Sequence, residues 1–154
     1  MFQPQRILLA SHGTAGARAA EDTALALATP GGALFHLTVV PDFWRGMMGD
    51  DWLNNVATRD AYCRHVETQL AREVEAHQRD LEARVRATGA RYAARVVLGK
   101  PADCLLAFAA ETDAQLVVIG SPRPRGVAGL RSLMQMERLV KGLAAPLLVV
   151  PFPR

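Results

Sequence analysis

Residues 115–129 read QLVVIGSPRPRGVAG, an apolar run followed by a loop rich in glycine, proline and arginine. The run from Leu116 to Ile119 is short, apolar and rich in β-branched residues, which is typical of a strand buried on both faces of a parallel sheet. Gly120 at its carboxyl end permits a tight turn and a close approach by a ligand, although it could also serve the turn alone. Ligands of open α/β sheets lie beyond the carboxyl ends of the strands, so this loop is the first candidate for a binding site.

The composition indicates a single globular domain over residues 1–154. Half of the residues are hydrophobic, 21% are charged and the net charge is +3. Arginines alternate with acids along one expected helix, which favours a solvated helix face over a nucleic-acid surface. No apolar run is long enough for a membrane helix, and the N-terminus lacks a signal-peptide layout. Cys63 and Cys104 lack zinc-ligand spacing and imply no disulfide framework, so we expect a cytoplasmic protein without a metal site.

Strand and helix signals alternate along the whole chain. The expected strands are 7–10, 33–40, 92–98, 116–119 and 147–150. The expected helices are 15–28, 58–88, 102–111 and 130–144. Parallel strands separated by helices need right-handed crossovers, which predicts a doubly wound, three-layer α/β domain with a five-stranded parallel sheet.

Two helices show a clear apolar face. In the first, burial is expected for Ala20, Ala24, Leu27 and Ala28, with Glu21 and its charged neighbours on other faces. In the long helix 58–88, a stripe steps by three or four residues along Val66, Leu70, Val74, His77, Leu81 and Val85. The stripe favours packing on the sheet over a coiled coil, and His77 within it is interpreted as a core or edge residue, not a ligand.

Residues 41–57 form a long irregular segment that contains Trp44 and Trp52. Such a length without secondary structure is unusual in a compact domain unless the segment has a use. Two interpretations remain open: the segment is a lid or a partner-binding patch, or its aromatic residues fold back onto the edge of the core.

The motifs of common catalytic sites are missing from the sequence. Ser11 and His12 are neighbours on a strand end and therefore point apart. Neither Ser11 nor Ser121 lies in a Gly-x-Ser-x-Gly elbow, and no Walker loop or Gly-x-Gly-x-x-Gly fingerprint occurs. The sequence therefore favours a binding protein over an enzyme.

Two strand ends offer donors for an anion. Gly13 follows the first strand, and Gly120, Gly126 and Gly129 follow the fourth, where their amides are not shielded by side chains. Helix N-termini add partial positive charge there, and the arginines of the loop, among them Arg123, add full charge. This arrangement suits phosphate, although an exposed arginine loop can also be ordinary surface.

Four segments resemble the universal stress protein (UspA-like) family in order and spacing. They are RILLA at 6–10, GKP at 99–101, DAQLVVIGS at 113–121 and APLLVVP at 145–151. The resemblance spans nearly the whole chain and implies a Rossmann-like sheet in the order 3-2-1-4-5. It also implies a homodimer formed by pairing the last strands, through Leu147, Leu148, Val149 and Val150.

Nucleotide-binding members of that family carry Gly, two residues, Gly, nine residues and then Gly with Ser or Thr, and an aspartate after the first strand. Gly120 matches the first glycine, but Arg123, the pair Leu133-Met134 and His12 stand at the other positions. By this resemblance the candidate site residues are Ser11, His12, Gly13, Val40, Gly120, Ser121, Arg123, Gly126 and Gly129.

These departures leave two hypotheses. The preferred one is a regulatory or binding module for stress adaptation that acts through an unknown protein partner and needs no cofactor, because the Gly-Ser pair and the aspartate are missing. The alternative is a protein that binds ATP or another adenine nucleotide through a modified phosphate loop, with Gly120 and the arginines retained.

Overall fold

The computed structural model describes residues 2–11, 15–40, 56–121 and 134–153. Strands and helices alternate along the chain, as the sequence predicted. The strands are β1 (Arg6–Ala10), β2 (Ala33–Val40), β3 (Arg91–Leu98), β4 (Leu116–Gly120) and β5 (Leu147–Val150). The helices are α1 (Ala15–Leu27), α3 (Val56–Ala87), α4 (Pro101–Thr112) and α5 (Met136–Gly142).

The five strands form one parallel sheet in the order β3-β2-β1-β4-β5. This confirms both the doubly wound fold and the strand order that the family resemblance implied. The chain leaves β1 toward β2 and β3 and then crosses back to β4 and β5, so the direction of winding changes between β1 and β4. At such a switch point the loops diverge and leave a crevice for a ligand.

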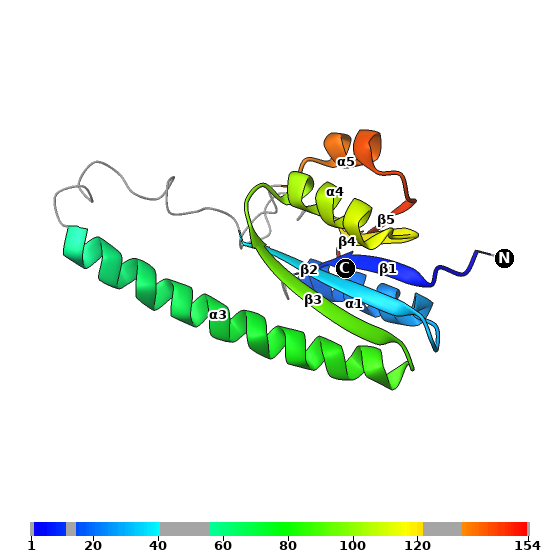
Figure 1. Ribbon diagram of the computed structural model, residues 1–154, viewed down its shortest axis with the longest axis horizontal. Helices are drawn as coiled ribbons and strands as arrows, with labels where there is room; N and C mark the ends of the chain where they lie inside the picture. Colours follow the sequence, from blue (N-terminus) through cyan, green and yellow to red (C-terminus); the bar gives the residue numbers. More distant parts are fainter. Residues whose placement is uncertain (1, 12–14, 41–55, 122–133, 154) are drawn as a thin grey trace.

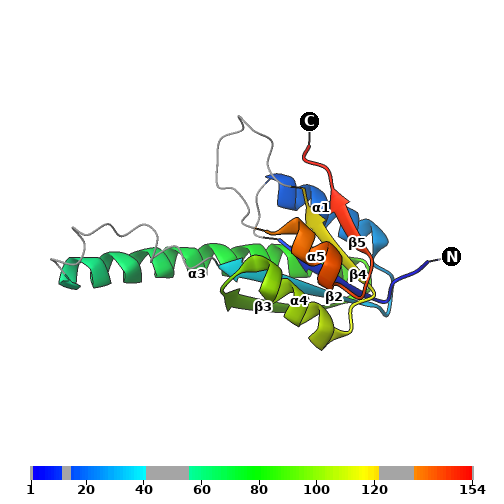
Figure 2. The same ribbon diagram turned by 90° about the horizontal axis from the view of Figure 1, so that it is seen from above.

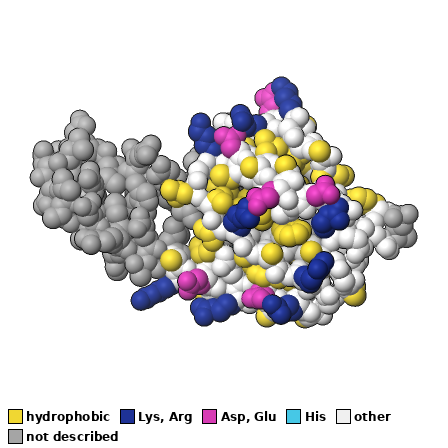
Figure 3. Space-filling model, viewed as in Figure 1, with side chains coloured by type: hydrophobic (Ala, Val, Ile, Leu, Met, Phe, Trp, Pro, Cys, Tyr) yellow, Lys and Arg dark blue, Asp and Glu magenta, His cyan; other side chains and the backbone are white. Residues whose placement is uncertain are grey.

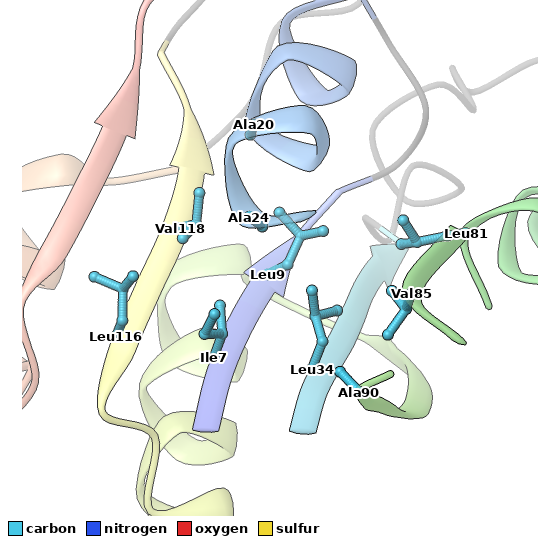
Figure 4. Close-up of a cluster of buried hydrophobic side chains, with 10 residues drawn as sticks. All are labelled: Ile7, Leu9, Ala20, Ala24, Leu34, Leu81, Val85, Ala90, Leu116 and Val118. Carbon is cyan, nitrogen blue, oxygen red and sulfur yellow. The ribbon is translucent and has the colours of Figure 1, made fainter. Parts of the chain in front are cut away.

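Helices cover the two faces of the sheet separately. α1 and α3 lie on one face, and α4 and α5 lie on the other (Figures 1 and 2). The first face buries a cluster from β1, β2, β4, α1 and α3, shown in Figure 4. The second buries another cluster, with Leu8, Leu37, Leu105, Phe108 and Leu139 among its members. Because successive strand residues point to opposite faces, Ile7 and Leu9 join the first cluster and Leu8 joins the second.

The expected helix 130–144 begins later and ends earlier than predicted. Met134 and Gln135 are not helical, and α5 spans only Met136–Gly142; residues 130–133 lie outside the described part of the chain. Leu143 is already extended, with φ −77° and ψ 135°. The chain has to reach Pro146 and β5 within three residues, and a residue before proline avoids helical conformation, so the helix stops early.

The long helix α3 packs on the sheet only along part of its length. Leu81 and Val85 are fully buried, whereas Val74 and His77 are half-buried. Figure 1 shows the N-terminal part of α3 extending past the end of the sheet. The predicted apolar stripe is therefore confirmed as a core face at its C-terminal end, while the side chains of Val66 and Leu70 lie outside the described residues.

The surface in Figure 3 carries acidic and basic side chains next to one another, with hydrophobic side chains between them. Several of these charges are paired at short range, as in Arg86 with Glu82 and Lys141 with Glu137. Within the described ranges, no helix combines the length and apolar character needed to cross a membrane.

Candidate functional site

The ends of β1 and β4 lie at the switch point and form the centre of the candidate site. Ser11 follows β1, and its amide donates to the carbonyl of Leu37 (3.2 Å). Ser121 follows β4, and its amide donates to the carbonyl of Val150 (2.8 Å). Ser11 and Ser121 thus extend the sheet by one residue on either side of the switch point, beyond the strand ends predicted at residues 10 and 119.

Gly120 allows the start of α1 to approach the end of β4. A Cβ atom at Gly120 would lie 2.7 Å from the carbonyl oxygen of Gly16, in the first turn of α1. A Cβ atom at Gly16 would in turn lie 3.1 Å from the ring of Phe152, which follows β5. Gly120 is therefore required for backbone packing, so its structural role is established whether or not a ligand approaches it.

Several predicted site residues cannot be placed relative to this centre. His12, Gly13, Arg123, Gly126 and Gly129 lie outside the described residues. So does most of the predicted irregular segment 41–57, except Val56 and Ala57, which already belong to α3. The backbone of Val40 ends β2 opposite Leu98 of β3, one strand away from β1. The site residues that the structure brings together are Ser11, Gly120 and Ser121.

The side chain of Ser11 points into the protein. Its side chain is 3% exposed, and its hydroxyl donates a short hydrogen bond to Oε1 of Glu21 on α1. Its carbonyl oxygen accepts from Nε2 of His36 (2.9 Å) and from the hydroxyl of Thr38 (3.4 Å). Ser11 is therefore anchored by its neighbours on both its side chain and its main chain.

Glu21 is the centre of this buried cluster, although the sequence interpretation placed it on an outer face of its helix. It is 1% exposed, and Ala17, Ala20 and Ala24 are buried on the same side of α1. Its carboxylate accepts from the Ser11 hydroxyl, from Nε2 of His77 and from Nη1 of Arg84 (3.4 Å). Burial raises the pKa of Glu21, but the hydrogen bonds from His77 and Ser11 outweigh it and lower that pKa overall.

His36 is a fully buried neutral histidine on β2. The carbonyl of Ser11 can only accept, so Nε2 must carry the proton and Nδ1 accepts from the hydroxyl of Tyr92 (2.7 Å). Burial, together with the neighbouring His77, lowers the pKa of His36 to about 4. Burial also raises the pKa of Tyr92, so its hydroxyl stays a donor.

This polar cluster, formed by Ser11, Glu21, His36, His77, Arg84 and Tyr92, was not predicted as a unit. One signal for it was present: His36 and Thr38 alternate with Leu37 in a strand that is otherwise apolar. Polar side chains at inward positions of a buried strand need partners, which could have directed attention to the neighbouring helices. The interpretation of His77 as a core or edge residue agrees with its contact to Glu21.

One of the positions at which the sequence departs from the family's nucleotide-binding motif lies within the described residues. Met134, which stands at the position of the motif hydroxyl, packs against the apolar cluster under α4 and α5. A thioether in that place offers no donor to a phosphate oxygen. Ser11 is committed to Glu21. In the part of the chain that the structure describes, no three His, Cys, Asp or Glu side chains are grouped to hold a metal ion.

Comparisons with known proteins point to one family. The family described as the Universal stress protein family matches residues 4–151. A search of the curated proteins finds no match.

Solved structures with the same fold include three universal stress proteins. One is a protein of the universal stress protein family from Burkholderia pseudomallei, with 27% identity, 96% of each chain covered and a TM-score of 0.57. The universal stress protein UspA from Lactobacillus plantarum has 19% identity over 94% of this chain and 96% of its own, with a TM-score of 0.68. A universal stress protein in complex with cAMP has 19% identity over 99% of this chain and 100% of its own, with a TM-score of 0.61.

The match covers almost the entire chain, and the strand order agrees with the order expected of that fold. The chain therefore belongs to the universal stress protein family.

Proposed function

We propose that this protein is a dimeric regulatory binding module, not an enzyme, and that it does not hold ATP in the usual manner of its family. The observation that carries the proposal is the position of Met134, which fills the apolar cluster under α4 and α5 where nucleotide-binding members have a hydroxyl. A cytoplasmic location agrees with the free thiol of Cys104.

The ATP part of the proposal is tested by titration calorimetry. We expect the native protein to bind ATP no more tightly than about 1 mM, because the phosphate loop has lost donors. Residual anion binding around Gly120–Gly129 should weaken as salt rises, because exposed arginines are screened. Micromolar ATP binding that Arg123→Ala abolishes would contradict the proposal and show that arginine replaces the lost donors.

A variant that restores the family motif provides the gain-of-function test. Combining Leu133→Gly, Met134→Ser and His12→Asp should raise ATP affinity. Met134→Ser alone is the matched control, since Met134 packs against the core and its loss lowers stability without completing the motif. Circular dichroism on both variants separates loss of fold from loss of binding.

A second candidate function is binding of an adenine nucleotide with fewer phosphates. It is favoured by the relative of the same fold that was solved with cAMP. A ligand with one phosphate depends less on the altered end of the motif than ATP does. Parallel titrations with ATP, AMP and cAMP distinguish the two candidates: selective binding of AMP or cAMP supports the second, and no heat from any of them supports the first.

The dimer is proposed to form through the free edge of β5. Among the described residues, β5 pairs only with β4, and the carbonyls of Pro146 and Val150 accept from the amides of Val117 in β4 and of Ser121 just after it. Residues 147 and 149 then direct their backbone groups away from β4, where a second copy could pair with them. Val149→Pro removes one such donor and no bond to β4, so light scattering should show a folded monomer; a native protein that is monomeric at micromolar concentration would contradict the dimer.

A further inference from the structure

The buried polar cluster joins five elements on the face of the sheet that α1 and α3 cover. Ser11 follows β1, His36 lies on β2, Glu21 on α1, His77 and Arg84 on α3, and Tyr92 on β3. Their contacts cross sequence separations of ten to more than sixty residues, as between Glu21 and Arg84. The cluster therefore fixes the relative positions of segments that are far apart in the chain.

His77 holds a particular place on α3. It lies one turn before the fully buried Leu81, and toward the N-terminus α3 extends past the sheet (Figure 1). Among the described side chains of α3, those before His77 are exposed or half-buried. The contact between His77 and Glu21 is thus the outermost polar anchor of α3 that the described residues provide.

Protonation of His36 is disfavoured in this arrangement. A cationic imidazole donates from Nδ1, where the Tyr92 hydroxyl now donates at 2.7 Å, so the Tyr92 O–H bond would have to rotate and its oxygen accept instead. The new charge would also face the ring of His77, whose centroid is 5.0 Å distant. An open state in which His77 has left and water reaches His36 has neither restriction.

We propose that the cluster is an acid-sensitive latch, in which protonation of His36 releases His77 and loosens the turns of α3 around His77. At neutral pH the latch is closed: Glu21 is ionised and bonded to His77, and neutral His36 bonds to Ser11. In mild acid the open state gains a proton on His36 that the closed state disfavours.

Other charged groups surround the latch on α1 and α3. On α1, Asp22 accepts from Arg84 at 2.5 Å, and on α3, Asp80 lies 3.8 Å from Arg84. Burial, together with the negative charge of Glu82 on α3, raises the pKa of Tyr92 on β3. Asp22 and Asp80 are largely exposed, so water screens them, and Glu21 is the buried anion that holds His77.

The size of the response follows from proton linkage. With a closed-state pKa of about 4 and an open-state value near the ordinary 6.5, the opening constant should rise about 30-fold between about pH 7.5 and pH 5. The rise should appear as faster amide hydrogen exchange, after correction for the intrinsic rate, at residues 69–77 of α3. Amides of the central strands, such as Leu8 and Val118, should change far less, because the latch opens locally.

His36→Gln is the decisive variant. A glutamine can donate to the Ser11 carbonyl and accept from the Tyr92 hydroxyl, but it cannot take up a proton in this range. The variant should stay closed at about pH 5 and lose the increase in exchange. Asp22→Asn is the matched control. Asp22 lies on α1 beside Glu21 and also contacts Arg84, but it is exposed, so this variant should keep the full acid response.

Three results would overturn the latch. They are a change of less than about threefold in α3 exchange in the native protein, an equal change in the central strands, or an unchanged acid response in His36→Gln. Glu21→Gln serves as a second test, since it weakens the bond to His77 at every pH. It should raise α3 exchange even at neutral pH; unchanged exchange in a folded Glu21→Gln protein would also contradict the proposal.

Discussion

The two faces of the sheet are built from different chemistry. Under α4 and α5 the buried side chains are apolar, from Leu8 and Val117 in the sheet to Leu105 and Phe108 on α4. Under α1 and α3 an apolar cluster of similar kind adjoins Ser11, Glu21, His36 and Thr38, which are the buried polar side chains among the described residues. The first face depends on burial and shape, and the second depends also on protonation.

This difference has a physical consequence for stability. Hydrophobic burial does not change with pH, whereas a buried network holds only while each member keeps its protonation state. Among the buried side chains that the structure describes, no nitrogen or oxygen atom lacks a hydrogen-bond partner. The α1 and α3 face is therefore well satisfied at neutral pH and is the face that acid should disturb first.

The largest expected effect comes from the apolar face. Leu105→Ala removes a fully buried side chain and should lower the free energy of unfolding by about 3 kcal/mol. The difference between variant and native protein should be the same at about pH 7.5 and pH 5. Cys104 packs against that cluster, but burial raises the pKa of its thiol above the ordinary value of 9.0, so the thiol stays protonated at both pH values. Urea unfolding at both pH values measures this difference in free energy. A difference that grows in acid would show that the apolar face also depends on pH.

The polar face should show the pH dependence that the apolar face lacks. The pKa of His36 is lowered in the folded state, so between pH 6.5 and about 4 the unfolded chain binds more protons and stability falls as pH falls. The loss should reach about 2 kcal/mol at about pH 5.

His36→Gln should remove that loss, again measured by urea unfolding. Glu21 acts in the same direction at lower pH: its pKa is lowered on folding, so its contribution is present above the ordinary value of 4.5 and is lost as pH falls through the folded pKa. If His36→Gln loses as much stability in acid as the native protein, another group is responsible for the effect.

Glycines on the two faces should differ in their tolerance of a side chain. Gly120→Ala places a Cβ atom 2.7 Å from the backbone carbonyl of Gly16, and neither backbone can move without disturbing α1 or β4. We expect a loss of about 2 kcal/mol, measured by thermal or urea unfolding. Stability unchanged within error would show that α1 can shift on the sheet.

Gly142→Ala on α5 is the matched substitution and should have the smallest effect. Its Cβ atom would meet the end of the Leu106 side chain at 2.9 Å, and that side chain can change rotamer. Alanine also favours the helix, which offsets part of the crowding, so the change should stay within about 0.5 kcal/mol. A loss as large as that of Gly120→Ala would mean that the α4 and α5 face is no more adaptable than the other.

The sequence by itself determined the order of elements and most of the core. Apolar runs such as Leu116 to Ile119 and helix-spaced residues such as Leu81 and Val85 are local signals, because a buried strand or helix face has to be apolar whatever surrounds it. The family resemblance added the strand order, which the sheet confirms. The late start and early end of α5 were missed, because that helix is limited by where β5 must begin.

Only the tertiary structure decided which polar residues belong together. Ala17 and Ala24 lie on the same side of the helix as Glu21, but no residue near Glu21 in the sequence indicates which partners could stabilise a buried carboxylate. Its partners His77 and Arg84 lie 56 and 63 residues away, and they meet it because β2 brings α3 back beside α1 on the same face. A buried charge is stable only with such partners, and partners brought together by a crossover are not encoded in local spacing.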